Sequence, residues 1–519
     1  MLLVAWAALV HTSAAHAHAS LIRSEPPDRA VVAALPAEIK LVFNEPVSPL
    51  VLRLVLPSGE VIELKARQAA DGASIILPLP PGSSVGTHLL SWRVVSADGH
   101  PVGGSLTFSI GHPSLPPPTP QASDIRLRTA IWLARLVLYV GLFVGIGGAF
   151  FLSWIAPMPS GRARSVAGAA LAAGLIAAML SVGLHGVDAL GAADANLGET
   201  RAWAYGLASP YGWTVGVAAL SLALALWALA KHGAPARWCS TLSLIGVGVA
   251  LASSGHAATA GPQIVTRPAV FAHAVCVTFW VGSLVPLAAT LTRDRDHTAL
   301  TRFSKAIPLP FGLLLVTGLL LAIVQVRQLE ALWTTSYGIV LLCKLSLVCV
   351  LLGLAGMNRW LTPRVMKDEA GAARQLRRSI ACELAIMALI LGLVASWRFT
   401  PPPRALLTAA AQPIHAHIHN DRAMADLQIE PARGGSRRIT LTLLDGRFGP
   451  LPAKAVTLVL SKPDAGIEPL RLPAKQADGG TWQVDDLRLP MAGRWRVRIE
   501  ILINDFEKIG IEDETDLTR

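Results

Sequence analysis

Two short segments near the start of the chain carry side chains that could bind a metal ion. The first is AHAHASL, residues 15 to 21, and the second is SADGHPVGG, in which Asp98 and His100 stand two positions apart. If the chain is cut after residue 17, His18 offers both its α-amine and its imidazole Nδ1 to one ion. Three nitrogens and a carboxylate suit Cu(II), which tops the divalent affinity order, better than Zn(II).

The alternative for the second segment is a plain turn, because Asp-Gly pairs commonly form capped loops. We interpret His88 and His112 of the same region as structural residues. The combination of an acidic residue, a histidine and an N-terminal histidine on one exported domain favours the metal site over the turn.

The first 17 residues, MLLVAWAALVHTSAAHA, are typical of a cleavable export signal. They contain an apolar run and end with Ala15 and Ala17 in the A-x-A positions. No Lys or Arg precedes the apolar run, so cleavage before His18 is a hypothesis.

The elements that must position these ligands are short alternating runs such as EIKLVFNEPV and THLLSWRVVS, which predict a β-sandwich over residues 18–112. A proline-rich linker follows at 113–124, and residues 412–519 return to strand-like alternation. The predicted fold is therefore an all-α membrane bundle of eight helices, over 125–400, flanked by two all-β domains of the immunoglobulin-like sandwich type.

Eight apolar runs approach or exceed the roughly twenty residues that a membrane helix needs. Loops after the odd-numbered runs hold fourteen Lys and Arg residues, if Arg359 at the end of the seventh run is counted with its loop, and loops after the even-numbered runs hold three. The positive-inside rule then places the loops after the odd-numbered runs in the cytoplasm and both termini outside, with the bundle in membrane lipid. The runs are approximately 131–155, 165–187, 211–230, 238–258, 268–291, 307–326, 337–361 and 379–399.

The net charge of +11 does not indicate nucleic-acid binding, because the excess lies between the apolar runs. Residues 18–112 carry seven basic and eight acidic residues, and residues 412–519 carry fifteen and sixteen. Both flanking domains are nearly neutral, so we expect no nucleic-acid partner.

Three histidines inside the apolar runs are predicted at one depth of the membrane: His185, His256 and His273. Imidazole and thiol groups there suit copper, and Cys276 lies one turn from His273 while Met179 lies below His185. The alternative is that each histidine bonds a neighbouring helix. Among the intramembrane charges we expect Glu383 to pair with Arg359.

The first domain resembles the CopC family of periplasmic copper-binding proteins, through HASL, the SEPP segment and WRVVSADGHPVGGSLTF. The likeness covers nearly all of residues 18–112. It implies a Cu(II) site made by the amine and imidazole of His18 with Asp98 and His100. The methionine-rich Cu(I) site of some members is not expected here, because this domain has no Met.

Residues 125–400 resemble the CopD family of inner-membrane copper proteins, through FAHAVCVTFWVGSLVPL, MNRW and RRSIACELAI. That likeness implies copper transfer across the inner membrane. Residues 412–519 look like the YtkA-type domain that can end such fusions. Their HAHIH run places His419 close to Met424 as further metal ligands, although an exposed histidine run is also typical of a flexible scavenger.

We therefore expect a copper import and resistance protein that receives copper ions, with a periplasmic copper donor as a further partner, and we do not expect an enzyme. An ATP-driven pump is excluded because the sequence has neither a phosphate-binding glycine loop nor a phosphorylated-aspartate motif. The alternatives are a membrane redox or haem-ligating protein and a protein that only sequesters copper.

Overall fold

The computed structural model describes most of the chain. The signal segment and the predicted ligands His18, Asp98, His100 and His256 lie outside the described residues. The described residues are 19, 21–28, 30–80, 85–96, 101–112, 114, 125–156, 161–191, 196–255, 258–291, 297–400, 402–404, 414–420, 422–431, 436–445, 449–477, 480–489, 491 and 493–517.

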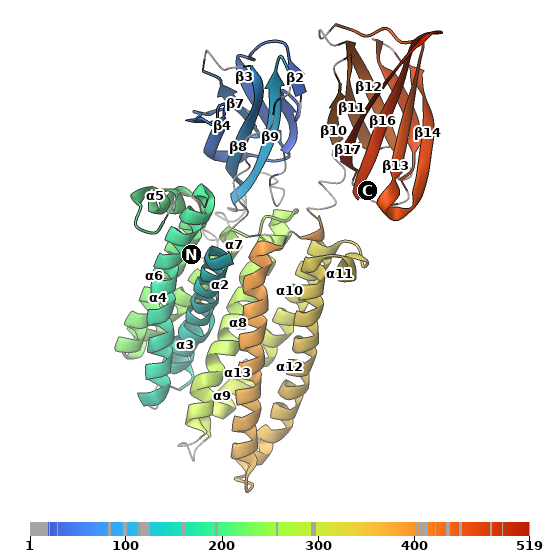
Figure 1. The fold of residues 1–519 in the computed structure, drawn as a ribbon. Helices are drawn as coiled ribbons and strands as arrows, with labels where there is room; N and C mark the ends of the chain where they lie inside the picture. The colour runs from blue at the N-terminus through green and yellow to red at the C-terminus, as the bar shows by residue number, and fades with distance from the viewer. Residues whose placement is uncertain are drawn as a thin grey trace. The chain divides into compact units, whose positions relative to one another are not determined.

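The N-terminal domain is a β-sandwich, as predicted (Figure 1). Its four-stranded sheet has the order β1-β3-β7-β6 and its five-stranded sheet the order β2-β9-β8-β4-β5. Alternate residues of β3 are buried, which matches the period of two that the sequence shows. The strands are β1 (Leu21–Glu25), β2 (Ala30–Val32), β3 (Glu38–Phe43), β4 (Val47–Val55), β5 (Val61–Glu63), β6 (Arg67–Gln68), β7 (Ser74–Pro78), β8 (Gly86–Ser96) and β9 (Pro101–Ile110).

The core of this sandwich is built from large apolar side chains of both sheets. Phe108 and Leu54 are fully buried, and the Phe43 and Trp92 rings meet edge to face with their centroids 5.2 Å apart. Such a core holds the strand ends that flank the predicted copper ligands in fixed positions.

The middle of the chain forms eight helical spans that are long and apolar enough to cross a membrane, as predicted. The spans are 125–154 (α2, Ile125–Val140; η1, Gly141–Ile146; α3, Gly147–Trp154), α4 (Gly161–Leu190), α6 (Pro210–Ala230), α7 (Gly233–Ser253), α8 (Gln263–Thr290), 298–326 (α9, Thr298–Ala306; α10, Pro308–Val326), α12 (Ser336–Met366) and 372–399 (α13, Ala372–Ser396; η2, Trp397–Phe399). Two short helices that the sequence did not indicate are α5 (Thr200–Ala208) and α11 (Ala331–Thr334).

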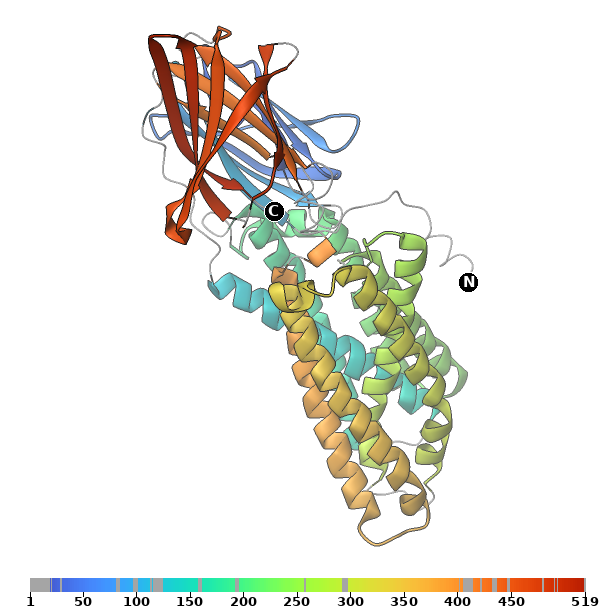
Figure 2. The same cartoon turned by 90° about the vertical axis from the view of Figure 1, so that its right-hand side faces the viewer.

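Glycines let several of these helices approach closely. A Cβ atom added at Gly147 of α3 would lie 1.9 Å from the carbonyl oxygen of Thr278 in α8, and Gly141 of η1 is similarly close to Gly174 of α4. Small residues at helix crossings are a common packing device in membranes, where van der Waals contact drives helix association. The long helices α12 and α13 run side by side (Figure 2).

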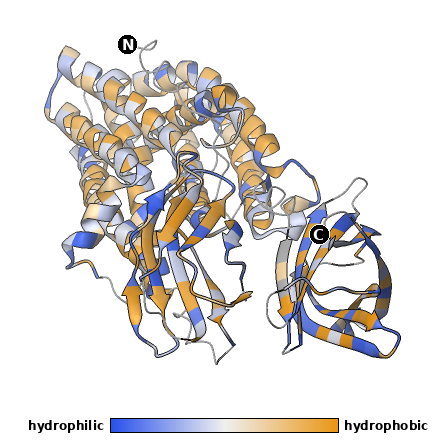
Figure 3. Ribbon diagram, turned by 90° about the horizontal axis from the view of Figure 1, so that it is seen from above, coloured by the Kyte–Doolittle hydropathy of each residue, from blue (hydrophilic) through white to orange (hydrophobic). Residues whose placement is uncertain are grey.

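The C-terminal domain is all-β, as predicted, but its strands form one continuous sheet. The sheet has the order β10-β11-β12-β15-β14-β13-β16-β17 and curls until β17 packs against β10, which gives it a barrel-like form. Its strands alternate hydrophilic and hydrophobic residues (Figure 3). They are β10 (Ile414–His419), β11 (Ala423–Pro431), β12 (Arg437–Asp445), β13 (Ala455–Lys462), β14 (Ile467–Gln476), β15 (Trp482–Leu487), β16 (Gly493–Asn504) and β17 (Glu507–Leu517), with the short helix η4 (Pro463–Ala465) before β14.

Candidate functional site

The predicted Cu(II) ligands of the N-terminal domain are flanked by well-packed residues. Ala19, next to His18, is 4% exposed and belongs to the sandwich core. Strand β8 ends at Ser96 and β9 begins at Pro101, and these two strands are neighbours in the five-stranded sheet. The chain is therefore anchored beside residue 18 and on both sides of residues 97–100. The ligand set itself stays a prediction.

Glu45 is a candidate oxygen donor that the sequence did not single out. It lies between β3 and β4 and is only 2% exposed. Buried carboxylates in proteins are paired with cations or coordinate metal ions. The signal in the sequence was an acidic residue in FNEPV, between two apolar strands, but no local pattern distinguishes it from an ordinary turn residue.

His88 has the structural role that the sequence analysis gave it. Its Nδ1 atom lies 3.1 Å from the carbonyl oxygen of Gly86, and its ring stacks on Phe108 with the centroids 5.1 Å apart. Burial lowers the pKa of His88 because the charged form is poorly solvated there. A neutral, stacked imidazole of this kind stabilises the sandwich core.

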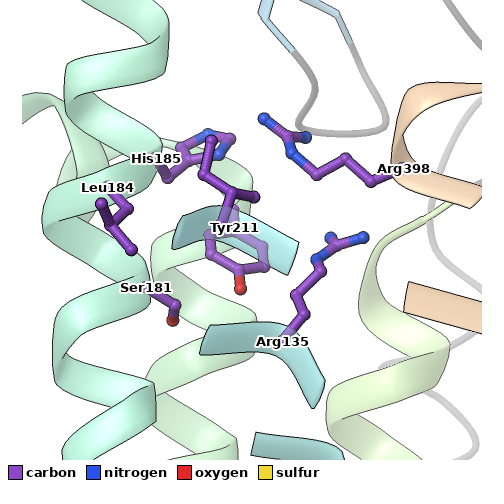
Figure 4. Close-up of a pocket in the computed structure, with 7 residues that line it drawn as sticks. Arg135, Ser181, Leu184, His185, Tyr211 and Arg398 are labelled. Atoms are coloured by element: carbon purple, nitrogen blue, oxygen red, sulfur yellow. The ribbon is translucent and has the colours of Figure 1, made fainter. Parts of the chain in front are cut away.

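In the membrane bundle, His185 of α4 lies in a small pocket beside Tyr211 of α6 (Figure 4). The two rings are 4.8 Å apart between centroids, and the Arg135 guanidinium of α2 lies 5.6 Å from the Tyr211 ring centroid. The pocket combines an imidazole with a phenol and two guanidinium groups. Its lining residues are Ile131, Arg135, Ser181, Leu184, His185, Tyr211 and Arg398.

The charges around this pocket are partly balanced. Arg398 is 5% exposed at its side chain and forms an ion pair with Asp188 of α4 at 2.5 Å. A metal cation bound at His185 would therefore lie near an ion pair and a second guanidinium, Arg135. Met179 is 66% exposed on the outside of α4, so the prediction that it lies below His185 as a soft ligand is wrong.

His273 of α8 makes a directed contact with helix α10. Its Nδ1 atom lies 3.2 Å from Thr317 Oγ1, and the Thr317 hydroxyl donates its own hydrogen to the Leu313 carbonyl at 2.7 Å. In the tautomer with the proton on Nδ1, the ring donates to this hydroxyl oxygen. In that tautomer Nε2 carries the lone pair, which is the form that binds metals.

The surroundings of His273 contain a thiol and an ammonium group. Cys276, one turn along α8, is 5% exposed and belongs to the bundle core. Lys344 of α12 is close enough to interact electrostatically with His273, and its Nζ atom lies 5.0 Å from the Trp397 ring centroid. A metal cation at His273 would therefore meet one cationic neighbour.

The structure corrects the predicted pairing of Glu383 with Arg359. Glu383 is 1% exposed and is hydrogen-bonded by Asn358, whereas Arg359 donates to Ser304 Oγ at 2.6 Å. Successive residues of a helix point about 100° apart, so Asn358 and Arg359 cannot both face Glu383, and Asn358 is the one that does.

The described residues do not bring the membrane histidines into one set. His185 lines a pocket with residues of α2, α6 and η2, whereas His273 is in hydrogen-bond contact with α10 and interacts electrostatically with Lys344 of α12. His256 lies outside the described residues, so a site that includes it stays a prediction. Within the described part of the chain, no group of three His, Cys, Asp or Glu side chains is placed to hold a metal ion.

In the C-terminal domain, His419 and Met424 are cross-strand partners. They face each other in the register of the antiparallel strands β10 and β11. Directly opposed residues of such a pair have Cβ atoms about 4.5–5.5 Å apart, so the predicted proximity follows from the register. Met424 is 5% exposed, and His419 is half-buried.

Comparison with known proteins identifies two parts of the chain. The family model of the CopC domain matches residues 21–111. That of CopD, Copper resistance protein D, matches residues 297–397. Copper resistance protein C of Xanthomonas campestris pv. juglandis is 41% identical over 113 residues, which are 20% of this chain and 88% of that protein. Through its first domain, this chain belongs to the CopC family.

A relative that spans the whole CopC–CopD arrangement is Copper transport protein CutJ of Bacillus subtilis (strain 168). It is 27% identical over 524 residues, which are 95% of each chain. The crystal structure of CopC from Methylosinus trichosporium OB3b is 30% identical, covers 18% of this chain and 95% of that chain, and gives a TM-score of 0.17. The YtkA-type resemblance of residues 412–519 stays a prediction.

The CopD match covers only the second part of the bundle, from α9 to α13. It includes Thr317 and Lys344 but neither His185 nor His273. Thr317 lies inside the matched segment and His273 lies before it in the sequence, and the two side chains are in contact in the structure.

Proposed function

We propose that this chain binds Cu(II) in the periplasm and passes copper inward across the bacterial inner membrane. The printed names of its relatives, Copper resistance protein C and Copper transport protein CutJ, support copper handling and transport. The outer site consists of His18, Asp98 and His100, to which we add Glu45 as an oxygen donor. In this proposal a periplasmic copper donor loads that site, and both chain termini lie in the periplasm.

The membrane path in this proposal uses His185, His256 and His273, with Cys276 as a soft ligand. The observation that carries the path is the contact of His273 Nδ1 with Thr317 Oγ1 inside a membrane span, because in the Nδ1-protonated tautomer it leaves Nε2 available to a metal ion. Imidazoles that ligate metals commonly donate their other N–H to an oxygen, which fixes the ring and its tautomer. Thr317 does the same for His273.

Copper uptake by cells that express the protein tests the proposal. We expect wild-type cells to accumulate cytoplasmic copper and His273→Ala cells to lose that accumulation. Thr317→Val, which keeps the shape of the side chain, should weaken uptake by about 10- to 100-fold if it lowers metal affinity as an outer-shell partner does. His232→Ala is the matched control, because His232 is exposed where α7 begins. Equal uptake by wild type and His273→Ala would contradict the path.

Two measurements distinguish this function from its alternatives. A protein that only sequesters copper would leave the cytoplasm of expressing cells copper-poor. A redox protein that ligates haem would show a Soret band in the optical spectrum of the purified chain. Either result would replace the proposed transport function.

The outer site has its own test, because it depends on the free amine of His18. A variant with one Met placed before His18 loses the chelate between amine and imidazole, and we expect its Cu(II) affinity to fall by orders of magnitude. Electron paramagnetic resonance of the Cu(II)-loaded protein would show the change in nitrogen ligands. Glu45→Gln should give a smaller loss, and equal Cu(II) affinity in all three proteins would refute the outer site.

A further inference from the structure

A buried carboxyl group lies on the face of α13 that packs against the rest of the bundle. Glu383 is 1% exposed, and Ser379, one turn earlier on the same face, is 3% exposed. Asn358 of the neighbouring helix α12 is hydrogen-bonded to the carboxyl. Glu383 therefore lies between two packed helices, inside a span that is apolar enough to cross a membrane.

Three oxygen atoms of this group lack a partner. Glu383 Oε2, Asn358 Oδ1 and Ser379 Oγ are buried, and none of them makes a hydrogen bond to another described residue. A carboxylate oxygen can only accept hydrogen bonds, so an ionised Glu383 leaves Oε2 as a charged acceptor without a donor. A buried charge of this kind is strongly unfavourable unless a counter-charge or a donor lies beside it.

The basic side chains of α12 and α13 do not supply that counter-charge. On α12, Arg359 donates to Ser304 Oγ at 2.6 Å, and Arg364 Nε lies 3.5 Å from a carboxylate oxygen of Glu369. Among the described residues, none of the basic groups forms an ion pair with Glu383. The basic residues in the first turns of α13 are exposed: Arg374, Arg377 and Arg378.

The other helices that pack on α13 are α2 and α8, and their charged groups face elsewhere. Arg135 of α2 lines a pocket with Arg398, which lies 15 residues beyond Glu383, or about 22 Å along a helix. Arg267, in the first turns of α8, donates to the carbonyl oxygen of Ala258 at 3.4 Å. The carboxyl of Glu383 is therefore left without a counter-charge by every helix around it in the described part of the chain.

A proton removes this imbalance. The protonated carboxyl is uncharged, and its Oε2 becomes an O–H donor next to two acceptors, Asn358 Oδ1 and Ser379 Oγ, that have no other donor among the described residues. An apolar site can keep a carboxylic acid neutral at neutral pH. Carboxyl groups inside membrane spans commonly belong to proton relays and ion pathways.

We propose that Glu383 holds a proton in the copper-free bundle and releases it when a copper ion enters. In this step the O–H bond of the carboxyl breaks and the proton leaves to water. The carboxylate that remains offsets one positive charge of the ion, and no electron is transferred. The release rests on the proposed transport function, whereas the bound proton does not depend on it.

Infrared spectroscopy of the full chain, purified in a detergent without ester groups, tests the bound proton. At neutral pH we expect the carbonyl band of a protonated carboxyl in wild type and its loss in Glu383→Gln. Glu369→Gln is the matched control and should keep the band, because Glu369 is exposed and paired with Arg364. Asn358→Leu should move the band to higher frequency, because the carboxyl loses a hydrogen bond. A band that is absent from wild type, or that persists unchanged in Glu383→Gln, would overturn the proposal.

The same measurement with copper tests the release. Copper should remove most of the intensity of this band in wild type and change nothing at its frequency in Glu383→Gln. If cells take up copper while the band of the purified chain stays constant on copper addition, the release is wrong. If the band is present but cells take up no copper, the transport function is contradicted instead, and the bound proton stands.

Discussion

The crossing of α3 and α8 gives a prediction whose size follows from the distances. A Cβ atom at Gly147 would lie 1.9 Å from the carbonyl oxygen of Thr278, and one at Gly282 would lie 2.3 Å from the Cα atom of Gly147. Ordinary van der Waals contact begins near 3.4 Å, so Gly147→Ala must push the helices apart by roughly 1.5 Å. Both clashing partners are backbone atoms, which cannot rotate away.

We expect Gly147→Ala to destabilise the bundle by about 1–3 kcal/mol or more, the usual cost of overpacking. Copper uptake should fall as well, because the displaced helix α8 carries His273. Cys276, also on α8, supplies the assay. Cys276 is buried, whereas the other four cysteines are exposed or half-buried and would be labelled in the folded protein. They are therefore replaced in a variant that keeps only Cys276, and the labelling rate of its thiol then reports opening at this crossing.

Gly168→Ala on α4 is the control, because a Cβ atom there meets nothing within 4 Å. It should stabilise its helix by about 0.5–1 kcal/mol, the propensity difference between Gly and Ala. The reasoning fails if the Cys276 thiol is labelled no faster in Gly147→Ala than in Gly168→Ala and the two variants unfold at the same temperature.

Three further predictions concern charged groups. Hydrogen bonds from the side chain and backbone of Ser74 lower the pKa of Asp71 in the N-terminal domain. A carboxyl whose pKa is lower in the folded state adds stability above its unfolded pKa, and that stability is lost as the pH falls through the folded pKa. When the pH is lowered from neutral to below about 4, the thermal unfolding temperature should therefore fall further in wild type than in Asp71→Asn. Lys344→Met removes the cation near His273 and should raise copper affinity there by about tenfold or more, since a unit charge even about 10 Å away is worth about 1.7 kcal/mol at an effective dielectric constant of 20, and about 1.4 kcal/mol is a factor of ten. Equal half-saturation of uptake would contradict this. Arg398→Gln should cost about 1–3 kcal/mol by leaving Asp188 without its ion-pair partner, and a double-mutant cycle with Asp188→Asn should show positive coupling in thermal unfolding.

The eight spans could be predicted from the sequence because lipid imposes a simple rule on length and apolarity. The sandwich predicted over residues 18–112 followed from alternation and from its resemblance to CopC. The single curled sheet of the C-terminal domain could not be predicted, because alternation fixes which residues face inward but not which strands become neighbours. The short helix α5 was missed because its nine residues are too few for a clear periodic pattern.

The candidate sites were predictable as residue types but not as environments. Thr317 is 44 positions from His273, and no local pattern marks that contact. The pairing of Glu383 with Arg359 failed because apolar runs predict a helix without fixing its rotation. A rotation of the helix by one residue places Asn358, instead of Arg359, opposite Glu383. The expected ion pair is then replaced by a hydrogen bond between the Asn358 amide and the Glu383 carboxyl.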